Sequence, residues 1–391
     1  MQVIRMTYNN EKGFVLPVGL MFLAILALLG TTAVIITTTD LKIGTNYKLS
    51  EQAFYVAEAG IQRGIDDMKN NSGSSFDDEL LGDDGSSNTS DDGILSFESP
   101  GSPVSFGAGT YSVQVIDNDD GDGNLFDDVD GKVIIASTGT VSGAKQTINV
   151  MFGTGSFNPD GALGVYGPNN PTIDIHGNPT IDGWDYDPPA DFNCSGKKCD
   201  GTINSQPGVV GIYTEQSSPA VTWHGSPNLD GDPNTTQYGG GNNTDWQAVA
   251  NKLIPQADNT YTGGGNVTGK TELGNRSSPE ITVVTTSSGD TQKFSGTVDG
   301  AGVLIIQGDG DVHFSGSFHW EGIVIVLSDS SDTAKIKVTG NAHVFGAFVS
   351  AGTATATLDF CGNPDIVYSS QALTYANDVY KIIYSWKDDS L

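Results

Sequence analysis

The sequence predicts an α+β, mainly β protein with a long N-terminal helix, a small antiparallel sheet and a C-terminal solenoid of the parallel β-helix kind. Three observations lead to this prediction. An uncharged apolar run follows a short polar leader, three alternating segments have the pattern of strands, and short β-type segments then recur between glycines. The expected parts are residues 1–13, 14–70, 71–103, 104–153 and 160–391.

The composition sets limits on the partners of this chain. Its 391 residues are enough for more than one domain plus an anchor, and 18 Lys and Arg stand against 47 Asp and Glu, for a formal net charge of −29. Such a charge repels nucleic acid and anionic lipid headgroups, and it favours divalent cations. We therefore expect no nucleic-acid partner.

The N-terminal segment has the properties of a membrane-spanning helix. No residue from Phe14 to Thr39 is charged, and this uncharged run is long enough to cross a bilayer as a helix. The leader before it, Met1 to Gly13, carries Arg5 and Lys12 on the side expected to stay cytoplasmic. The remainder of the chain would then lie outside the cytoplasm.

The junction between leader and apolar run resembles a type IV prepilin cleavage site. Lys12, Gly13 and Phe14 stand directly before the apolar run, whereas a secretory signal is cut after its apolar region. The resemblance implies that prepilin peptidase cleaves after Gly13 and methylates the new N-terminus at Phe14. An ordinary single-pass anchor for an exported domain is the alternative.

Two segments beyond the membrane run extend this resemblance. Thr37–Lys42 and Glu51–Ile61 are similar to the PilX N-terminal pattern, over about Gly13 to Met68. The resemblance implies a minor pilin that is anchored in the inner membrane and then built into a pilus or pseudopilus, at or near its tip. Its implied partners are the major pilin, other minor pilins, the assembly platform, and a tip adhesin or surface glycan.

One position departs from the pattern of major pilins. They carry Glu at the fifth mature position, where this chain has Val18. A carboxylate in lipid is costly unless it is paired, so its absence removes one docking contact between subunits. The departure resembles minor pilins and also the tip pseudopilin of type II secretion, which we keep as an alternative function.

The helix is expected to continue beyond the membrane as an amphipathic stalk and to end in a polar linker. Apolar and small residues recur at helical spacing, and residues 71–103 are rich in Ser, Gly, Asp and Asn. The expected apolar stripe comprises Leu49, Ala53, Val56, Ala57, Gly60 and Ile61.

An acidic loop lies between the first two of three predicted strands, at 109–116, 132–137 and 146–152. Oxygen-bearing side chains alternate along residues 117–130, with glycines that allow a sharp turn, and this is the pattern that Ca²⁺ coordination needs. The match to an EF-hand-like loop is partial, because its twelfth position is Val129. A solvated acidic hairpin is the alternative. The candidate ligands are Asn118, Asp120, Asp122, Asn124 and Asp128.

The large C-terminal part repeats itself. Residues 176–183 recur as 224–231 with a shorter echo at 361–366, and β-type runs begin at Gly302, Gly322 and Gly346. Repetition with glycine at the corners predicts the stacked coils of a β-helix, and a β-sandwich is the alternative.

Cysteine and histidine usage gives weaker signals. Cys194 and Cys199 lie close together and are candidates for a disulfide in an exported chain, leaving Cys361; three free thiols are the alternative. The five histidines all lie in this part, where stacking at coil positions is the simpler explanation.

No nucleophile–base pair stands out, so we expect no enzyme; a surface-anchored, polysaccharide-active β-helix enzyme remains an alternative.

Overall fold

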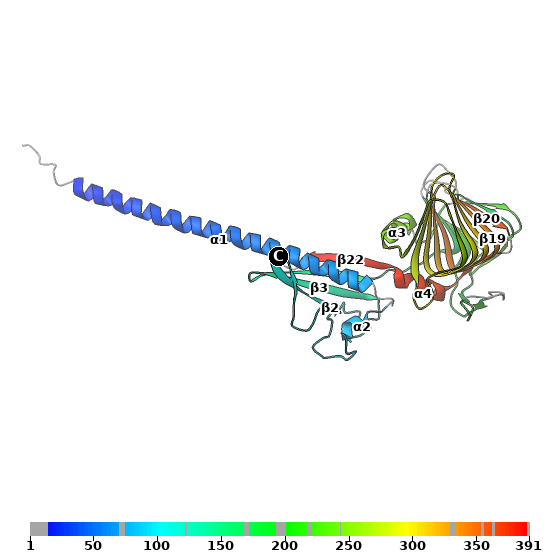
Figure 1. Cartoon of the computed structure of the whole chain (residues 1–391), viewed down its shortest axis with the longest axis horizontal. Coiled ribbons are helices and arrows are strands. Elements are labelled where there is room, and N and C mark those ends of the chain that lie inside the picture. The colour runs from blue at the N-terminus through cyan, green and yellow to red at the C-terminus, as the bar shows by residue number, and fades with distance from the viewer. Residues whose placement is uncertain are drawn as a thin grey trace, which may run out of the picture.

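The computed structural model arranges the chain as a rod with a broad head (Figure 1). It describes residues 15–69, 75–121, 123–167, 172–192, 201–216, 220–242, 244–328, 334–352, 356–361 and 364–388. A long helix forms the rod, a small sheet lies along its second half, and a β-solenoid stands at the far end. The predicted fold class is confirmed.

The rod is one continuous helix, α1 (Val15–Lys69), of 55 residues. At 1.5 Å per residue its length is about 80 Å. Its first two-thirds has apolar side chains exposed on all sides, whereas its last third buries one stripe. The buried residues recur at helical spacing and include five of the six predicted positions, all except Leu49. They are Ala53, Val56, Ala57, Gly60, Ile61, Gly64, Ile65 and Met68.

The stripe packs on a five-stranded antiparallel sheet in the order β1-β2-β3-β4-β22. Its alternate side chains face α1, as the period of two in a strand requires. Helix and sheet approach closely, because a Cβ on Gly139 would overlap the carbonyl oxygen of Ala53. The strands are β1 (Val104–Phe106), β2 (Gly109–Asp117), β3 (Lys132–Val141), β4 (Ala144–Thr154) and β22 (Lys381–Asp388).

The segment expected to be a flexible linker, 71–103, is part of this core where the structure describes it. Phe76, Leu80 and Leu95 are buried against α1 and the sheet, and a short helix, α2 (Asp77–Leu81), positions the first two. The prediction was wrong for residues 75–103, because the polar average of the segment hid three large apolar residues that the small core needs.

The solenoid has three faces, divided by glycines at its corners. Its longest strands, β17 (Thr291–Gly308), β18 (Asp311–Ser328) and β19 (Ala334–Gly352), are parallel and in register throughout. Gly296, Gly316 and Gly340 stack at one corner with φ between 125° and 128°; Gly302, Gly322 and Gly346 stack at the next. We call the segments before, between and after these two corners face A, face B and face C.

The coils are not stacked in the order of the chain. The first coil consists of β5 (Gly161–Tyr166), β6 (Ile173–His176) and β7 (Thr180–Asp182). It pairs on one side with the last coil, made by β19, β20 (Ala356–Cys361) and β21 (Asp365–Tyr368). On its other side it pairs with the second coil, β10 (Val210–Thr214), β11 (Val221–His224) and β12 (Asn228–Asp230). The three sequence echoes therefore lie on neighbouring coils, as the repetition predicted.

The remaining elements close the two ends of the stack or cover its outside. The strand β13 (Thr236–Tyr238) lies beyond β10, and β16 (Glu280–Thr286), β15 (Gly265–Leu273) and β14 (Asn259–Thr262) form the other end. Outside the coils lie α3 (Trp246–Leu253), the 3-10 helix η2 (Ile254–Gln256), α4 (Ser370–Val379) and the hairpin of β8 (Tyr186–Asp187) and β9 (Thr202–Ile203).

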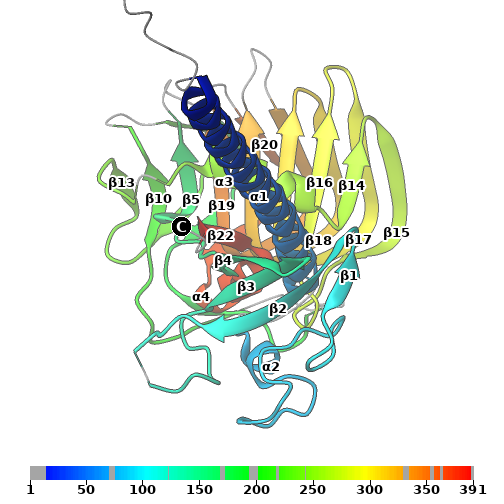
Figure 2. The same cartoon turned by 90° about the vertical axis from the view of Figure 1, so that its left-hand side faces the viewer.

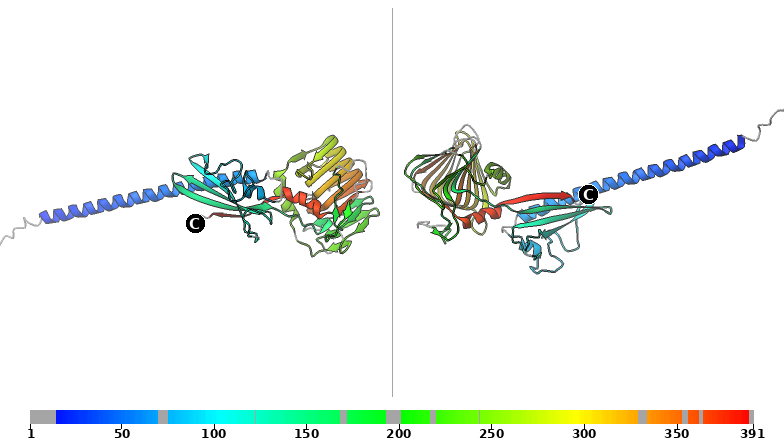
Figure 3. Two further views of the ribbon diagram at one scale, coloured as in Figure 1. Left: turned by 90° about the horizontal axis from the view of Figure 1, so that it is seen from below. Right: turned by 180° about the vertical axis from the view of Figure 1, so that it is seen from behind.

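The solenoid is an insertion between two neighbouring strands of the small sheet. The chain leaves β4 at Thr154, builds the coils, and returns through α4 to β22, which pairs antiparallel with β4. Figures 2 and 3 show β22 at the edge of the small sheet, and in Figure 3 it runs back from the solenoid along that sheet. The expected boundaries, 104–153 and 160–391, miss this strand, because its partner lies more than 200 residues earlier in the sequence.

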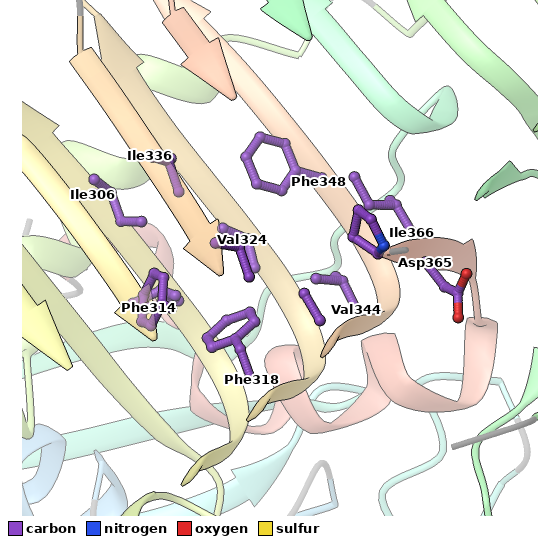
Figure 4. A pocket seen from close by; sticks show the side chains of 13 residues that line it. Ile306, Phe314, Phe318, Val324, Ile336, Val344, Phe348, Asp365 and Ile366 are labelled. Atoms are coloured by element: carbon purple, nitrogen blue, oxygen red, sulfur yellow. The ribbon is translucent and has the colours of Figure 1, made fainter. Parts of the chain in front are cut away.

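The interior of the solenoid is apolar and closed. Aromatic rings follow one another along the stack, including Phe294 on Phe314 with centroids 5.1 Å apart. Figure 4 shows a cavity beside Phe314 and Phe318, with a volume of about 20 Å³. That is room for about one water molecule, so a ligand has to bind on the outside of the coils.

The glycine corners give a first prediction. Gly316→Ala places a methyl group against the carbonyl oxygen of Gly296 at a φ of 125°. We expect this to lower the free energy of unfolding by about 3 kcal/mol, since both strain and overlap are backbone effects. Gly289→Ala is the matched control, because Gly289 also has a positive φ but nothing within 4 Å of an added Cβ. It should cost about 1 kcal/mol in denaturant unfolding, and equal effects of the two changes would contradict the overlap.

Candidate functional site

The first candidate is the exposed part of α1. The helix is long and apolar enough to cross a membrane, and its most hydropathic window has no residue buried against the rest of the chain. Several threonines that follow the apolar run donate their hydroxyls to carbonyls one turn back, as Thr37 does to Ala33 at 2.9 Å. These bonds satisfy the hydroxyls within the helix, so the whole segment presents an apolar surface.

The second candidate is the acidic loop after β2. Carboxylate oxygens of Asp120, Asp128 and Asp130 all lie within 4.8 Å of one another. Asp120 accepts a hydrogen bond from the backbone N–H of Val129 at 2.9 Å, which folds the loop back on itself. Lys132 Nζ lies 2.7 Å from Asp130 Oδ2 and neutralises part of the charge. The loop thus gathers three carboxylates around one point.

Asp128 links this loop to the core. Its two carboxylate oxygens accept hydrogen bonds from the backbone N–H groups of Phe76 at 2.9 Å and Lys132 at 3.0 Å. Burial raises the pKa of Asp128, the neighbouring carboxylate of Asp130 raises it further, and these backbone hydrogen bonds act against the rise. The side chain therefore carries a charge that its surroundings only partly compensate.

The predicted calcium ligands fall into three groups. Asp120 and Asp128 lie together, and Asp130 lies with them. Asp130 was not predicted as a ligand, although its place in the alternation of acidic residues was a signal for it. Asn118 donates its amide to Asp130 at 3.3 Å, and within the described residues its carbonyl oxygen is buried without a hydrogen-bond partner. Asn124 is exposed and accepts from the N–H of Phe126 at 3.3 Å.

Five of the predicted site residues lie outside the described ranges. They are Asp122 of the acidic loop, Gly13 and Phe14 of the processing site, and Cys194 and Cys199 of the candidate disulfide.

The third candidate is a buried charge cluster on the outer side of face B. The guanidinium of Arg276 contacts both carboxylate oxygens of Glu321, at 2.6 Å each, and His319 Nε2 lies 2.9 Å from the same carboxylate. Glu321 is fully buried and His319 nearly so. Burial raises the pKa of Asp299, which is opposite His319 on the neighbouring strand, while His319 and Lys270 oppose the rise.

This cluster fastens a loop to the solenoid. Arg276 also donates to the carbonyl oxygens of Pro189 and Ala190, and its guanidinium lies over the ring of Phe192. Both oxygens of Glu321 are thus engaged by cationic or imidazole partners, which suits a structural brace better than a general base. Sequence reasoning missed the cluster because Arg276 and Glu321 are 45 residues apart and carry no motif.

The other histidines lie at coil positions. His176 and His224 occupy the same place on neighbouring coils and stack with ring centroids 4.2 Å apart, and His343 Nδ1 lies 3.0 Å from Asp365. The stacking of this pair agrees with the explanation favoured from the sequence.

Comparison with known proteins identifies the N-terminal part. Residues 12–62 match the PilX N-terminal family. The N-terminal segment of this chain belongs to that family. The match covers α1 from its first residue to Gln62, including most of the stripe that packs on the small sheet, so this part of the chain is type IV pilin-like. The recognition made from Gly13 to Met68 is confirmed.

Other comparisons add little. No curated protein matches the chain. Among solved structures, the competence-associated pilin ComZ from Thermus thermophilus aligns over 87% of this chain and 97% of its own, at 11% identity and a TM-score of 0.23. At that TM-score the alignment carries no argument.

The buried cluster gives a second prediction. Glu321→Ala leaves the buried ends of Arg276 and His319 without their carboxylate, and we expect a loss of about 3 to 5 kcal/mol in the free energy of unfolding. Glu272→Ala is the control, since Glu272 is an exposed carboxylate at the edge of the same face. Denaturant unfolding followed by tryptophan fluorescence measures both. Losses below about 0.5 kcal/mol for both variants would contradict the brace.

Proposed function

We propose that this chain is a minor pilin, anchored in the inner membrane and then incorporated into a type IV pilus or pseudopilus, at or near its tip. The observation that carries the proposal is the geometry of α1. Its first part exposes apolar side chains on all sides, while its last third packs on a small antiparallel sheet. Such a helix can be held by lipid before assembly and by neighbouring helices afterwards, and it would act in both settings without refolding.

The proposal implies a defined set of partners. Prepilin peptidase would remove residues 1–13 and methylate Phe14, and the assembly platform, the major pilin and other minor pilins would contact α1. Val18 leaves the first turns of α1 without an acidic side chain, so this subunit lacks one docking contact of major pilins. A subunit of low copy number at the end of a filament tolerates that lack better than a subunit repeated throughout it.

The position of the solenoid supports display rather than catalysis. It stands at the opposite end of the molecule from the free part of α1, and it is joined through both β4 and β22 (Figure 1). We propose that it serves adhesion or the binding of a partner and that it is not an enzyme. The enzymatic alternative requires release of reducing sugar ends from a polysaccharide by the purified protein.

A tip pseudopilin of type II secretion shares these features. The absent acidic residue in the first turns of α1 fits that role equally well. Deletion of one assembly system at a time separates the two, since the protein would be lost from sheared filaments only when its own system is deleted. Immunogold labelling would then locate the solenoid on the filament.

Processing gives a third prediction. Gly13→Leu should block cleavage, leave the leader attached and exclude the protein from sheared filaments. Gly19→Ala is the matched control, because an added Cβ at Gly19 meets nothing within 4 Å and lies beyond the cleavage site. Intact mass of the purified protein measures both. The assignment fails if the wild-type protein still begins at Met1 in cells that have active prepilin peptidase.

We also propose that the acidic loop binds Ca²⁺. Asp120, Asp128 and Asp130 supply the charged oxygens, and the buried carbonyl of Asn118 is available as a neutral one. A hard cation with six to eight oxygen ligands suits this set, with water completing the shell. Binding would offset the repulsion among the carboxylates and the penalty for the buried Asp128, although Lys132 competes for Asp130.

The calcium proposal gives a fourth prediction. Millimolar Ca²⁺ should raise the melting temperature of the full-length protein in detergent by a few degrees, because only the folded loop binds the ion. The double variant Asp120→Asn with Asp130→Asn should lose this shift, and Asp83→Asn, an exposed acid outside the loop, should keep it. An unchanged melting temperature of the wild type, or a shift that survives in the double variant, would rule the site out.

A further inference from the structure

The three faces of the solenoid differ in what covers their outer sides. On face C, α3 and α4 pack against the coils, and Trp246, Leu253 and Leu373 share a core with its outward residues. On face B the loop ending at Phe192 is fastened by Arg276, and Tyr186 packs over Phe345. On face A the outward side chains that the structure describes are exposed or half-buried. Face A is thus the free face of the domain.

Face A also points away from the membrane helix. Figure 1 shows α3 and α4 on the side of the solenoid that faces α1, and β20, a strand of face A, at the opposite extreme of the molecule. A subunit held through α1 would present this face outward.

Parallel register arranges the side chains of face A in rows. Each strand contributes one residue to a row, and neighbouring residues are about 4.8 Å apart. The central row crosses β17, β18, β19, β20, β6 and β11 and consists of Lys293, His313, Lys337, Asp359, His176 and His224. Lys335 lies beside Lys337 on β19, in the next row.

The basic end of this row contrasts with the charge of the chain. Lys293, Lys335 and Lys337 lie on two strands that flank β18, in a protein whose net charge is −29. Partial burial lowers the pKa of His313 between them, and the ammonium groups of Lys337 and Lys293 add to this effect, while Asp311 and Asp359 oppose it. Lys337 Nζ lies 2.9 Å from Asp359, and both side chains are about one-third exposed. On β17, β18 and β19 the outward charged side chains of face A are these three lysines and Asp311, an excess of positive charge that Asp359 on β20 partly offsets.

The face offers charge and hydrogen bonds rather than flat apolar area. Its described outward residues include Thr, Ser, Lys, His and Asp but no Phe, Tyr or Trp, because Phe294 and Phe314 point into the core. Individually weak ion pairs become effective when a polymer brings many charges to a regular array.

We propose that face A binds a linear acidic polysaccharide laid across the strands, with its carboxylate or sulfate groups on Lys293, Lys335 and Lys337. This inference rests on the proposed display function, and it adds the face and the chemistry of the ligand. The interior is closed, α3 and α4 cover face C, and the loop ending at Phe192 covers part of face B, whereas face A lets an extended polymer contact several coils at once.

The test uses the full-length protein in detergent micelles and immobilised polygalacturonate, with dextran as the neutral polymer. We expect saturable binding to polygalacturonate that weakens as NaCl rises from about 50 mM to about 500 mM. The triple variant Lys293→Gln, Lys335→Gln, Lys337→Gln should bind at least about tenfold more weakly. Lys252→Gln is the matched control, since Lys252 is an exposed lysine of α3 on the covered side.

Several outcomes would overturn the inference. They are equal binding to dextran, equal or tighter binding to duplex DNA, wild-type affinity in the triple variant, and an equal loss in Lys252→Gln. Unchanged melting of the triple variant excludes misfolding, and the exposed pair Lys293→Gln with Lys335→Gln offers a milder version. Filament incorporation is scored separately, so a protein that enters filaments but does not bind the polymer refutes only this inference.

Discussion

The pairing of β22 with β4 is the constraint on which the arrangement of this molecule depends. The strand that completes the small sheet comes from the end of the chain, so the solenoid has to begin and end at the same place. A simple stack would leave its two ends far apart. Here the first coil lies beside the last one, and the second coil extends outward from it. Both connections to the sheet therefore leave from the middle of the stack.

The junction between sheet and solenoid is well packed. Phe157, which follows β4, stacks on Tyr380 before β22 with centroids 4.9 Å apart, and its N–H donates to Asn377 at 2.8 Å. Asp185 accepts hydrogen bonds from the N–H and hydroxyl of Ser370 at the start of α4, where a carboxylate also interacts favourably with the helix dipole. A pull on the solenoid would thus be carried by two chain segments and not by a single hinge.

Because the interior of the solenoid is closed, ligands and partners can bind this domain only at its outer surfaces. Glycine corners keep the coils in register and the apolar residues inside, while the outward positions are free to vary. Each face uses this freedom differently: face C accepts two helices, face B holds a loop through a buried ion pair, and face A stays open. The open face carries three lysines, Lys293, Lys335 and Lys337, in a chain whose net charge is −29.

The sequence by itself determined the elements that depend on local pattern. The apolar run, the stripe of α1, the three central strands and the glycine-bounded repeats were all predictable, because each is set by side-chain period and by residues with special backbone freedom. Tertiary structure alone decided which distant segments meet. These contacts join residues that no repeating pattern in the sequence connects. They are the pairing of β22, the order of the coils, the burial of Phe76, the approach of Asp130 to Asp120, and the Arg276–Glu321 pair. Such contacts depend on how the whole chain folds, and no short stretch of sequence encodes them.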